Sequence, residues 1–154
     1  MGRETLETAL TPVLEALRGA DPGDAGLAAR LAASLPVDGP VCAAVRTAAR
    51  KGVEEGWLCN REAGGVRFSR PMKPSPATGD LCVDAVVMDR VAGPRHLHPN
   101  GEINLCFAEE GAPNFCGHPE GWVVFPPGSV HVPRVDGGRM LILYFLPAGA
   151  IEFK

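Results

Sequence analysis

The 154-residue sequence has no long hydrophobic run. Its longest apolar stretch, Met140 to Leu146, is far too short to cross a bilayer. No apolar segment follows the N-terminal Met-Gly-Arg-Glu, so we expect no signal peptide. Basic residues form no cluster and the net charge is −3, which argues against a nucleic-acid partner. These absences predict a cytoplasmic protein that contacts neither a membrane nor nucleic acid.

Cysteine is too irregularly spaced for a disulfide framework or a zinc ribbon. There are five cysteines, an odd number, and no two have the two-residue spacing of a zinc-ribbon or redox motif. Without an export signal, we expect reduced thiols. A role as small buried hydrophobic residues is the simplest interpretation for all of them, namely Cys42, Cys59, Cys82, Cys106 and Cys116.

The first 56 residues have a helical pattern. Apolar residues recur at helical spacing between positions 6 and 17, although Pro12 is expected to break or restart this helix. Asp24 can cap a second helix, and a third is expected from about Val41 to Glu55 with a glycine at its end. No chemistry is visible in residues 1–56, so this segment is expected to cover the rest of the chain or to form a subunit contact.

From residue 57 onward, short β-type runs alternate with Gly, Pro and Asn. Such runs predict an antiparallel sandwich or barrel. We therefore expect residues 57–154 to form a β-barrel on which residues 1–56 pack, as one structural domain overall. The expected strands are Trp57–Arg61, Val66–Arg70, Leu81–Val91, Glu102–Phe107, Trp122–Phe125, His131–Val135, Met140–Leu146 and Ala150–Phe153.

Three of the four histidines fall into one pattern with a glutamate. His96 and His98 alternate along a strand, so their side chains point the same way. A Pro-Asn-Gly turn brings Glu102 back toward these imidazoles, and a Pro-Pro-Gly turn delivers His131. Three neutral imidazoles and one carboxylate suit one divalent ion, with a position left open for water or substrate. We favour Fe or Mn, and Zn, Ni or Cu would also fit.

Strand parity extends this site. If Glu102 faces inward, Asn104 and Cys106 face inward too. The alternate residues then form an apolar outer face, which needs cover from the N-terminal helices or from a second subunit. These outward residues are Ile103, Leu105 and Phe107.

The segments Gly93–Gly111 and Gly121–His131 resemble the two cupin motifs, G…H-x-H-x-x-x-E…G and G…P-x-G-x-x-H. The gap before His96 is shorter than usual, and Val135 stands where the second motif commonly ends in Asn. The resemblance implies a mainly β fold, a cupin with a small jelly-roll β-barrel, here preceded by the N-terminal helical segment. Cupins commonly pair, so a homodimer is expected.

A closer resemblance covers most of the chain. The phrases Arg95–Phe107, Gly117–His131 and Leu143–Phe153 resemble the 4-hydroxylaminobenzoate lyase family, small bacterial proteins of nitroaromatic degradation. The resemblance implies conversion of 4-hydroxylaminobenzoate and water to 3,4-dihydroxybenzoate and ammonia. This conversion is redox-neutral, so it needs no nicotinamide or flavin, and no nucleotide-binding motif is visible. A Lewis-acidic metal ion would favour N–O cleavage, and Glu102, as ligand or proton carrier, is the catalytic candidate.

The implied substrate is a small aromatic acid whose carboxylate would suit an arginine. Arg67 and Arg70 on an early strand are the candidates for this contact. Other candidate substrate contacts are Asn104 on the inward face, His118 in a loop outside both motifs, and Tyr144, whose ring could stack on the substrate.

Two other functions use the same residues. The first is another metal-cupin enzyme, such as a dioxygenase that opens an aromatic ring or oxidises a thiol with iron and O₂. The second is a non-enzymatic protein that binds a small aromatic acid. Oxygen uptake distinguishes the dioxygenase from the lyase, because only the dioxygenase consumes O₂.

Overall fold

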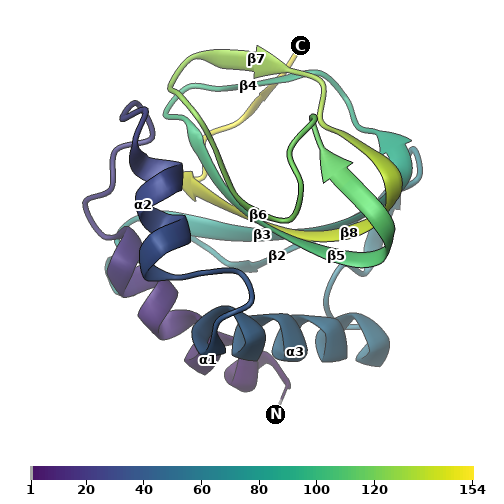
Figure 1. The fold of residues 1–154 in the computed structure, drawn as a ribbon, viewed down its shortest axis with the longest axis horizontal. Coiled ribbons are helices and arrows are strands. Elements are labelled where there is room, and N and C mark those ends of the chain that lie inside the picture. Colours follow the sequence, from purple (N-terminus) through teal and green to yellow (C-terminus); the bar gives the residue numbers. More distant parts are fainter. Residues whose placement is uncertain (1) are drawn as a thin grey trace.

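The computed structural model describes residues 2–154, which form three α-helices followed by β-structure (Figure 1). The helices are α1 Gly2–Leu17, α2 Leu27–Ser34 and α3 Pro40–Glu55, with a short 3₁₀ helix, η1, at Pro76–Thr78. The strands are β1 Arg61–Ala63, β2 Val66–Met72, β3 Leu81–Ala92, β4 His96–His98, β5 Glu102–Phe115, β6 Gly121–Phe125, β7 Ser129–His131, β8 Arg134–Pro147 and β9 Glu152–Phe153.

The strands form two antiparallel sheets. The larger sheet has the order β1-β2-β3-β8-β5-β6, and the smaller has the order β7-β4-β9. Figure 1 looks along the barrel, with β7 and β4 forming one wall and the large sheet curving beneath them as the other. The predicted mainly β jelly-roll barrel with N-terminal helices is therefore confirmed.

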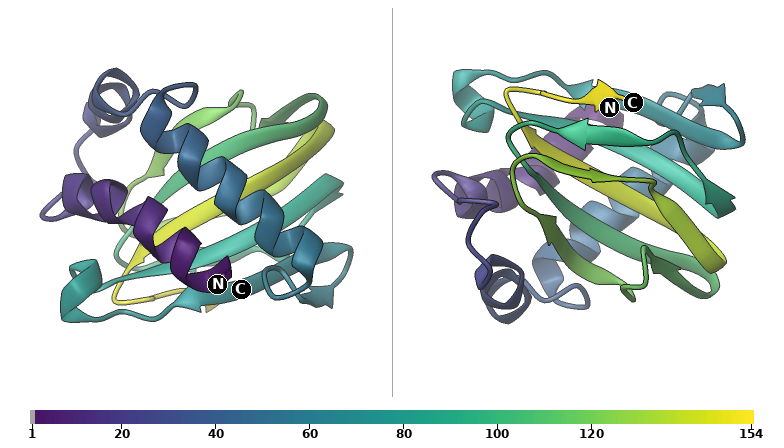
Figure 2. Two further views of the ribbon diagram at one scale, coloured as in Figure 1. Left: turned by 90° about the horizontal axis from the view of Figure 1, so that it is seen from below. Right: turned by 90° about the horizontal axis from the view of Figure 1, so that it is seen from above.

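The helices cover the outer face of the large sheet. Figure 2 shows α1 and α3 lying across this face, on the side away from the small sheet. Ile103, Leu105 and Phe107 from β5 are at most 1% exposed and share one core with buried residues of all three helices. The parity prediction for β5 is confirmed: Cys106 belongs to the second core, inside the barrel. The chain's own helices cover the apolar outer face, so this face gives no reason to expect a second subunit. The homodimer remains a prediction that rests on the cupin resemblance alone.

Helix α1 runs through Pro12 without a break, so the prediction that this proline breaks or restarts the helix was wrong. Pro12 and Thr8, whose carbonyl loses its hydrogen bond, both lie on the exposed face, where water can solvate that carbonyl. The buried face carries the packing that keeps the helix intact. It consists of Leu6, Leu10, Val13, Leu14 and Leu17.

The other helix ends follow local chemistry. Asp24 does not cap α2; its carboxylate accepts a hydrogen bond from the Gly26 amide at 2.9 Å and pairs with Arg30, and the helix begins at Leu27. Helix α3 lies close to the predicted range and ends at Gly56, whose φ of 84° requires the left-handed conformation that glycine adopts without strain.

One predicted strand does not form, and another is divided in the structure. The amides of Trp57 and Leu58 bond to the Gly52 carbonyl at the end of α3, so no strand forms before Arg61. Pro133 separates β7 from β8, because proline has no amide hydrogen for a strand ladder. No helix within residues 2–154 is long and apolar enough to span a membrane, and the cytoplasmic location stays a prediction.

Candidate metal centre

Backbone turns bring four polar residues to one point on the inner wall of the barrel. His96 and His98 lie on β4, and His131 lies opposite His96 on the paired strand β7. Gly101 links β4 to Glu102: its amide bonds to the His98 carbonyl at 3.1 Å and its φ is 84°. A Cβ on Gly101 would lie 2.6 Å from the Cβ of Pro22 and 3.0 Å from the Phe125 carbonyl oxygen, so the turn accepts only glycine.

The ligand atoms of His96, His98, Glu102 and His131 all lie within 4.8 Å of one another. Glu102 Oε2 is 3.0 Å from His98 Nε2, and Glu102 Oε1 is 2.8 Å from His131 Nε2. His96 Nε2 is 3.3 Å from His131 Nε2. The structure therefore brings the four predicted ligands together.

The fit to a metal ion is visible in the hydrogen bonding of these atoms. Both Glu102 oxygens and His98 Nε2 are buried without a hydrogen bond in the described chain, although they lie within 3.0 Å of neighbouring ring nitrogens or oxygens. A buried polar atom without a hydrogen bond carries a desolvation cost of about 1–3 kcal/mol. A cation at their common focus would remove this cost, so the donor set fits one divalent ion.

Electrostatics keep the donors in the forms that bind metals. Burial, and to a smaller extent the neighbouring His98, lower the pKa of His96 to about 4, so the His96 imidazole is neutral at pH 7. Burial alone would raise the pKa of Glu102, but the His131 and His98 imidazoles more than offset it, and the net pKa is lowered. Neutral imidazole and ionised carboxylate are the protonation states that coordinate metals.

Metal-free protein is expected to lose about 3 kcal/mol of unfolding free energy through His96 as the pH falls from 6.5 to about 4. The unfolded chain takes up this proton near pH 6.5, whereas the folded chain takes it up only near pH 4, so the stability is present above the unfolded pKa and lost below it. Urea denaturation of chelator-treated protein across this range measures the loss. His96→Gln is the control; equal pH slopes for both proteins would contradict the assignment.

The remaining candidate residues lie at different distances from the cluster. Asn104 is fully buried beside it and donates to the Val123 carbonyl at 3.2 Å, while its Oδ1 has no partner in the described chain. Tyr144 is paired with Asn104 across the sheet, and its ring centroid is 6.5 Å from that of His98. His118 is exposed and contacts the cluster only through Phe125.

A cavity of about 520 Å³ opens beside His96. This volume lies within the usual range for small-molecule sites. Its walls include Arg70, Tyr144 and apolar residues of β2 and β3, and Phe153 stands at its rim with 66% of its surface exposed. The ring of Phe153 is 6.3 Å from that of His96. Phe153 could not be identified from the sequence, because β9 pairs with β4 only in the tertiary fold.

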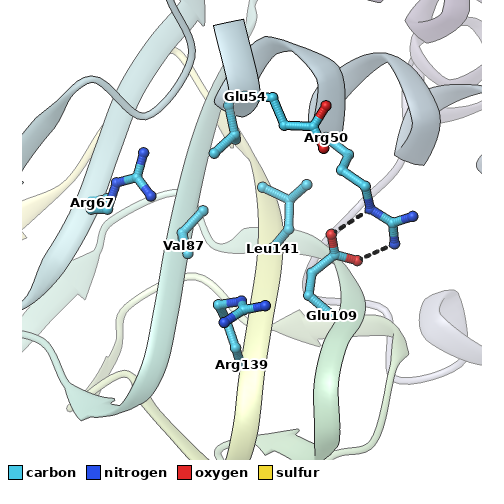
Figure 3. A pocket seen from close by; sticks show the side chains of 8 residues that line it. Arg50, Glu54, Arg67, Val87, Glu109, Arg139 and Leu141 are labelled. Carbon is cyan, nitrogen blue, oxygen red and sulfur yellow. Dashed lines mark hydrogen bonds and ion pairs between the residues drawn. The ribbon is translucent and has the colours of Figure 1, made fainter. Parts of the chain in front are cut away.

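Arg67 lies on the opposite face of the sheet. It is paired with Val87, which is paired with Leu141, a residue of the core beneath the helices. Arg67 therefore lines a separate cavity of about 510 Å³, on the side opposite Arg50 and Glu109 (Figure 3). In this cavity Arg50 and Glu109 form a two-bond ion pair at 2.7 Å. The structure thus separates the two arginines considered for the substrate carboxylate.

An antiparallel jelly-roll barrel with three histidines and a glutamate converging on its inner wall defines a cupin. Within this class, the profile of the family described as PnbB, 4-hydroxylaminobenzoate lyase, matches residues 8–153. The chain belongs to the 4-hydroxylaminobenzoate lyase family, and it is a lyase.

Two curated relatives carry the name 4-hydroxylaminobenzoate lyase. The protein from Nocardioides sp. (strain LMS-CY) is 37% identical over 115 residues, which cover 68% of this chain and 67% of the relative. The protein from Pseudomonas putida is 33% identical over 119 residues, which cover 66% of this chain and 68% of the relative.

Among solved structures, DMSP lyase DddQ from Ruegeria pomeroyi DSS-3 is similar over nearly the whole chain. Its TM-score is 0.54 at 19% sequence identity, and the match covers 98% of this chain and 96% of that one. The likeness includes the helical segment as well as the barrel, and it concerns the fold alone.

Proposed function

We propose that this chain converts 4-hydroxylaminobenzoate and water to 3,4-dihydroxybenzoate and ammonia, with one divalent metal ion. One observation carries the proposal. In a chain whose curated relatives are named 4-hydroxylaminobenzoate lyase, four ligand atoms converge, and one of the ligands, His96, lines a cavity large enough for a small aromatic acid. The ligands we propose are His96, His98, Glu102 and His131.

The reaction balances without an external oxidant or reductant. The N–O bond breaks with its electron pair on the departing oxygen, and a water oxygen bonds to the ring carbon beside the nitrogen-bearing carbon. The resulting imine is hydrolysed, which places the second hydroxyl on the ring and releases ammonia. The steps use two waters and release one, so one water is consumed overall.

The bound ion would supply Lewis acidity toward a substrate oxygen. Glu102, ionised and buried among imidazoles, would hold the ion and accept a proton at either carboxylate oxygen. Tyr144 lines the cavity and its hydroxyl makes no hydrogen bond to another described residue, so it can donate to the substrate. Burial raises the pKa of Tyr144 well above its ordinary value, which keeps this proton in place at pH 7.

Anaerobic turnover tests the proposal. Metal-loaded protein is expected to form dihydroxybenzoate and ammonia in equal amounts without O₂, and chelation is expected to stop both. Activity regained on adding back a single metal would identify the ion. Both products are quantified by chromatography and by an ammonia assay.

The contrary results separate the alternatives. If product still forms after complete metal removal, the lyase assignment holds and the metal dependence is wrong. Substrate consumed only with O₂ would indicate a dioxygenase. Binding of substrate without turnover under any condition would indicate the non-enzymatic protein.

A further inference from the structure

Arg70 is not free to bind a substrate carboxylate. Its Nε donates to Asp84 Oδ1 at 2.6 Å, and its Nη2 donates to Asp84 Oδ2 at 3.1 Å. A third contact joins Nη2 to the Gly149 carbonyl at 3.5 Å. Asp84 lines the same cavity, so an incoming carboxylate would meet a neutralised pair rather than a free cation.

Arg61 is the other cation on the wall of this cavity. It is paired with Phe68 on β2, which is paired with Val86 on β3. Directly paired residues of antiparallel strands place their side chains on one face, and Val86 packs against the core inside the barrel. Arg61 thus faces the cavity, and within residues 2–154 no hydrogen bond or ion pair engages its guanidinium.

The cavity between Arg61 and His96 is lined by apolar side chains, including Phe68, Val86 and Met88. A cation, an apolar wall and a metal-binding cluster match the three parts of a substituted benzoate: carboxylate, ring and reacting group. We infer that Arg61 binds the carboxylate of the aromatic substrate and selects ring acids over uncharged rings, an inference that rests on the proposed function. Arg70 then serves to position Asp84 and the loop at Gly149.

The test compares two substrates that differ only in the carboxylate. In Arg61→Gln, kcat/KM for 4-hydroxylaminobenzoate is expected to fall about tenfold to thirtyfold, mainly through KM, because a partly exposed charge-assisted hydrogen bond is lost. Turnover of phenylhydroxylamine, which lacks the carboxylate, is expected to change less than about twofold. Arg67→Gln is the matched control: it removes the same charge from the neighbouring strand on the opposite face and is expected to change neither substrate.

Benzoate binding, measured by calorimetry on the same three proteins, separates this inference from the proposed function. Wild type and Arg67→Gln are expected to bind benzoate, and Arg61→Gln to bind it at least about tenfold more weakly. If wild type turns over neither substrate but shows this binding pattern, the lyase assignment fails and the carboxylate site stands. Equal losses for both substrates, equal benzoate affinity in Arg61→Gln and wild type, or no benzoate binding by wild type would overturn the inference.

Discussion

Replacing His131 with alanine is expected to abolish stoichiometric metal binding and to lower turnover about a thousandfold, while the chain stays folded. The Lewis acidity of a bound ion contributes several kcal/mol to a reaction of this type, and about 4 kcal/mol corresponds to that factor. His131 lies at the end of a short strand and its side chain is 15% exposed, so its truncation leaves no large cavity. Metal content by elemental analysis and kcat/KM for 4-hydroxylaminobenzoate measure the two effects.

His118→Ala is the matched control for His131→Ala. It removes an imidazole from an exposed loop. The ring of Phe125 lies between His118 and the nearest ring of the cluster, that of His131. Metal content and turnover are expected to stay within about twofold of wild type, because surface substitutions outside a site have small effects. If His131→Ala lacks metal but keeps full activity, the metal is not needed for the proposed reaction.

Replacing Phe107 with alanine is expected to lower the free energy of unfolding by about 3–5 kcal/mol. Phe107 is fully buried on the outer face of β5, and the Arg46 guanidinium lies 5.6 Å from its ring centroid. Truncation would leave a cavity between the large sheet and the helices. Domains of this size have unfolding free energies of about 5–15 kcal/mol, so the loss would be at least about a fifth of the total. Guanidinium denaturation at a fixed metal content measures the change.

Phe153→Ala removes the same ring from an exposed position and is the control for Phe107→Ala. Its effect on unfolding is expected to be within about 0.5 kcal/mol. Similar midpoints for Phe107→Ala and wild type would mean that the helices contribute little to the stability of the barrel. That result would also mean that residues 57–154 are stable independently of residues 1–56.

Most of the proposed metal cluster could be predicted from the sequence, because local geometry fixes three of its four residues. His96 and His98 share a face by strand alternation, and a three-residue turn returns the chain at Glu102. Only His131 needed the tertiary fold, and the Pro-Pro-Gly turn before it marked the start of a new strand. The inward and outward faces of β5 followed from the same alternation.

The proposed carboxylate site at Arg61 could not be predicted in the same way. Arg67 and Arg70 are three residues apart and alternate faces, so parity alone shows that no more than one of them faces the cavity. It does not show which one, because the register of β2 against β3 sets the face. Arg61 was missed because the expected strand Trp57–Arg61 ended at this residue and the β1–β2 pairing was not foreseen. The continuous helix α1 could not be predicted from the presence of a proline alone, because a proline on the exposed face is tolerated when the buried face is well packed.

The alternation along β5 has a consequence for how this family can diverge. Positions 102, 104 and 106 face the ligand side, whereas 103, 105 and 107 face the helices. Neighbouring residues are therefore under different constraints: one set must suit the chemistry of the site, and the other must pack against the helices. A lineage that adopts a new substrate can change every second residue of this strand without disturbing the helices. A lineage that remodels its helices can change the others and keep the reaction.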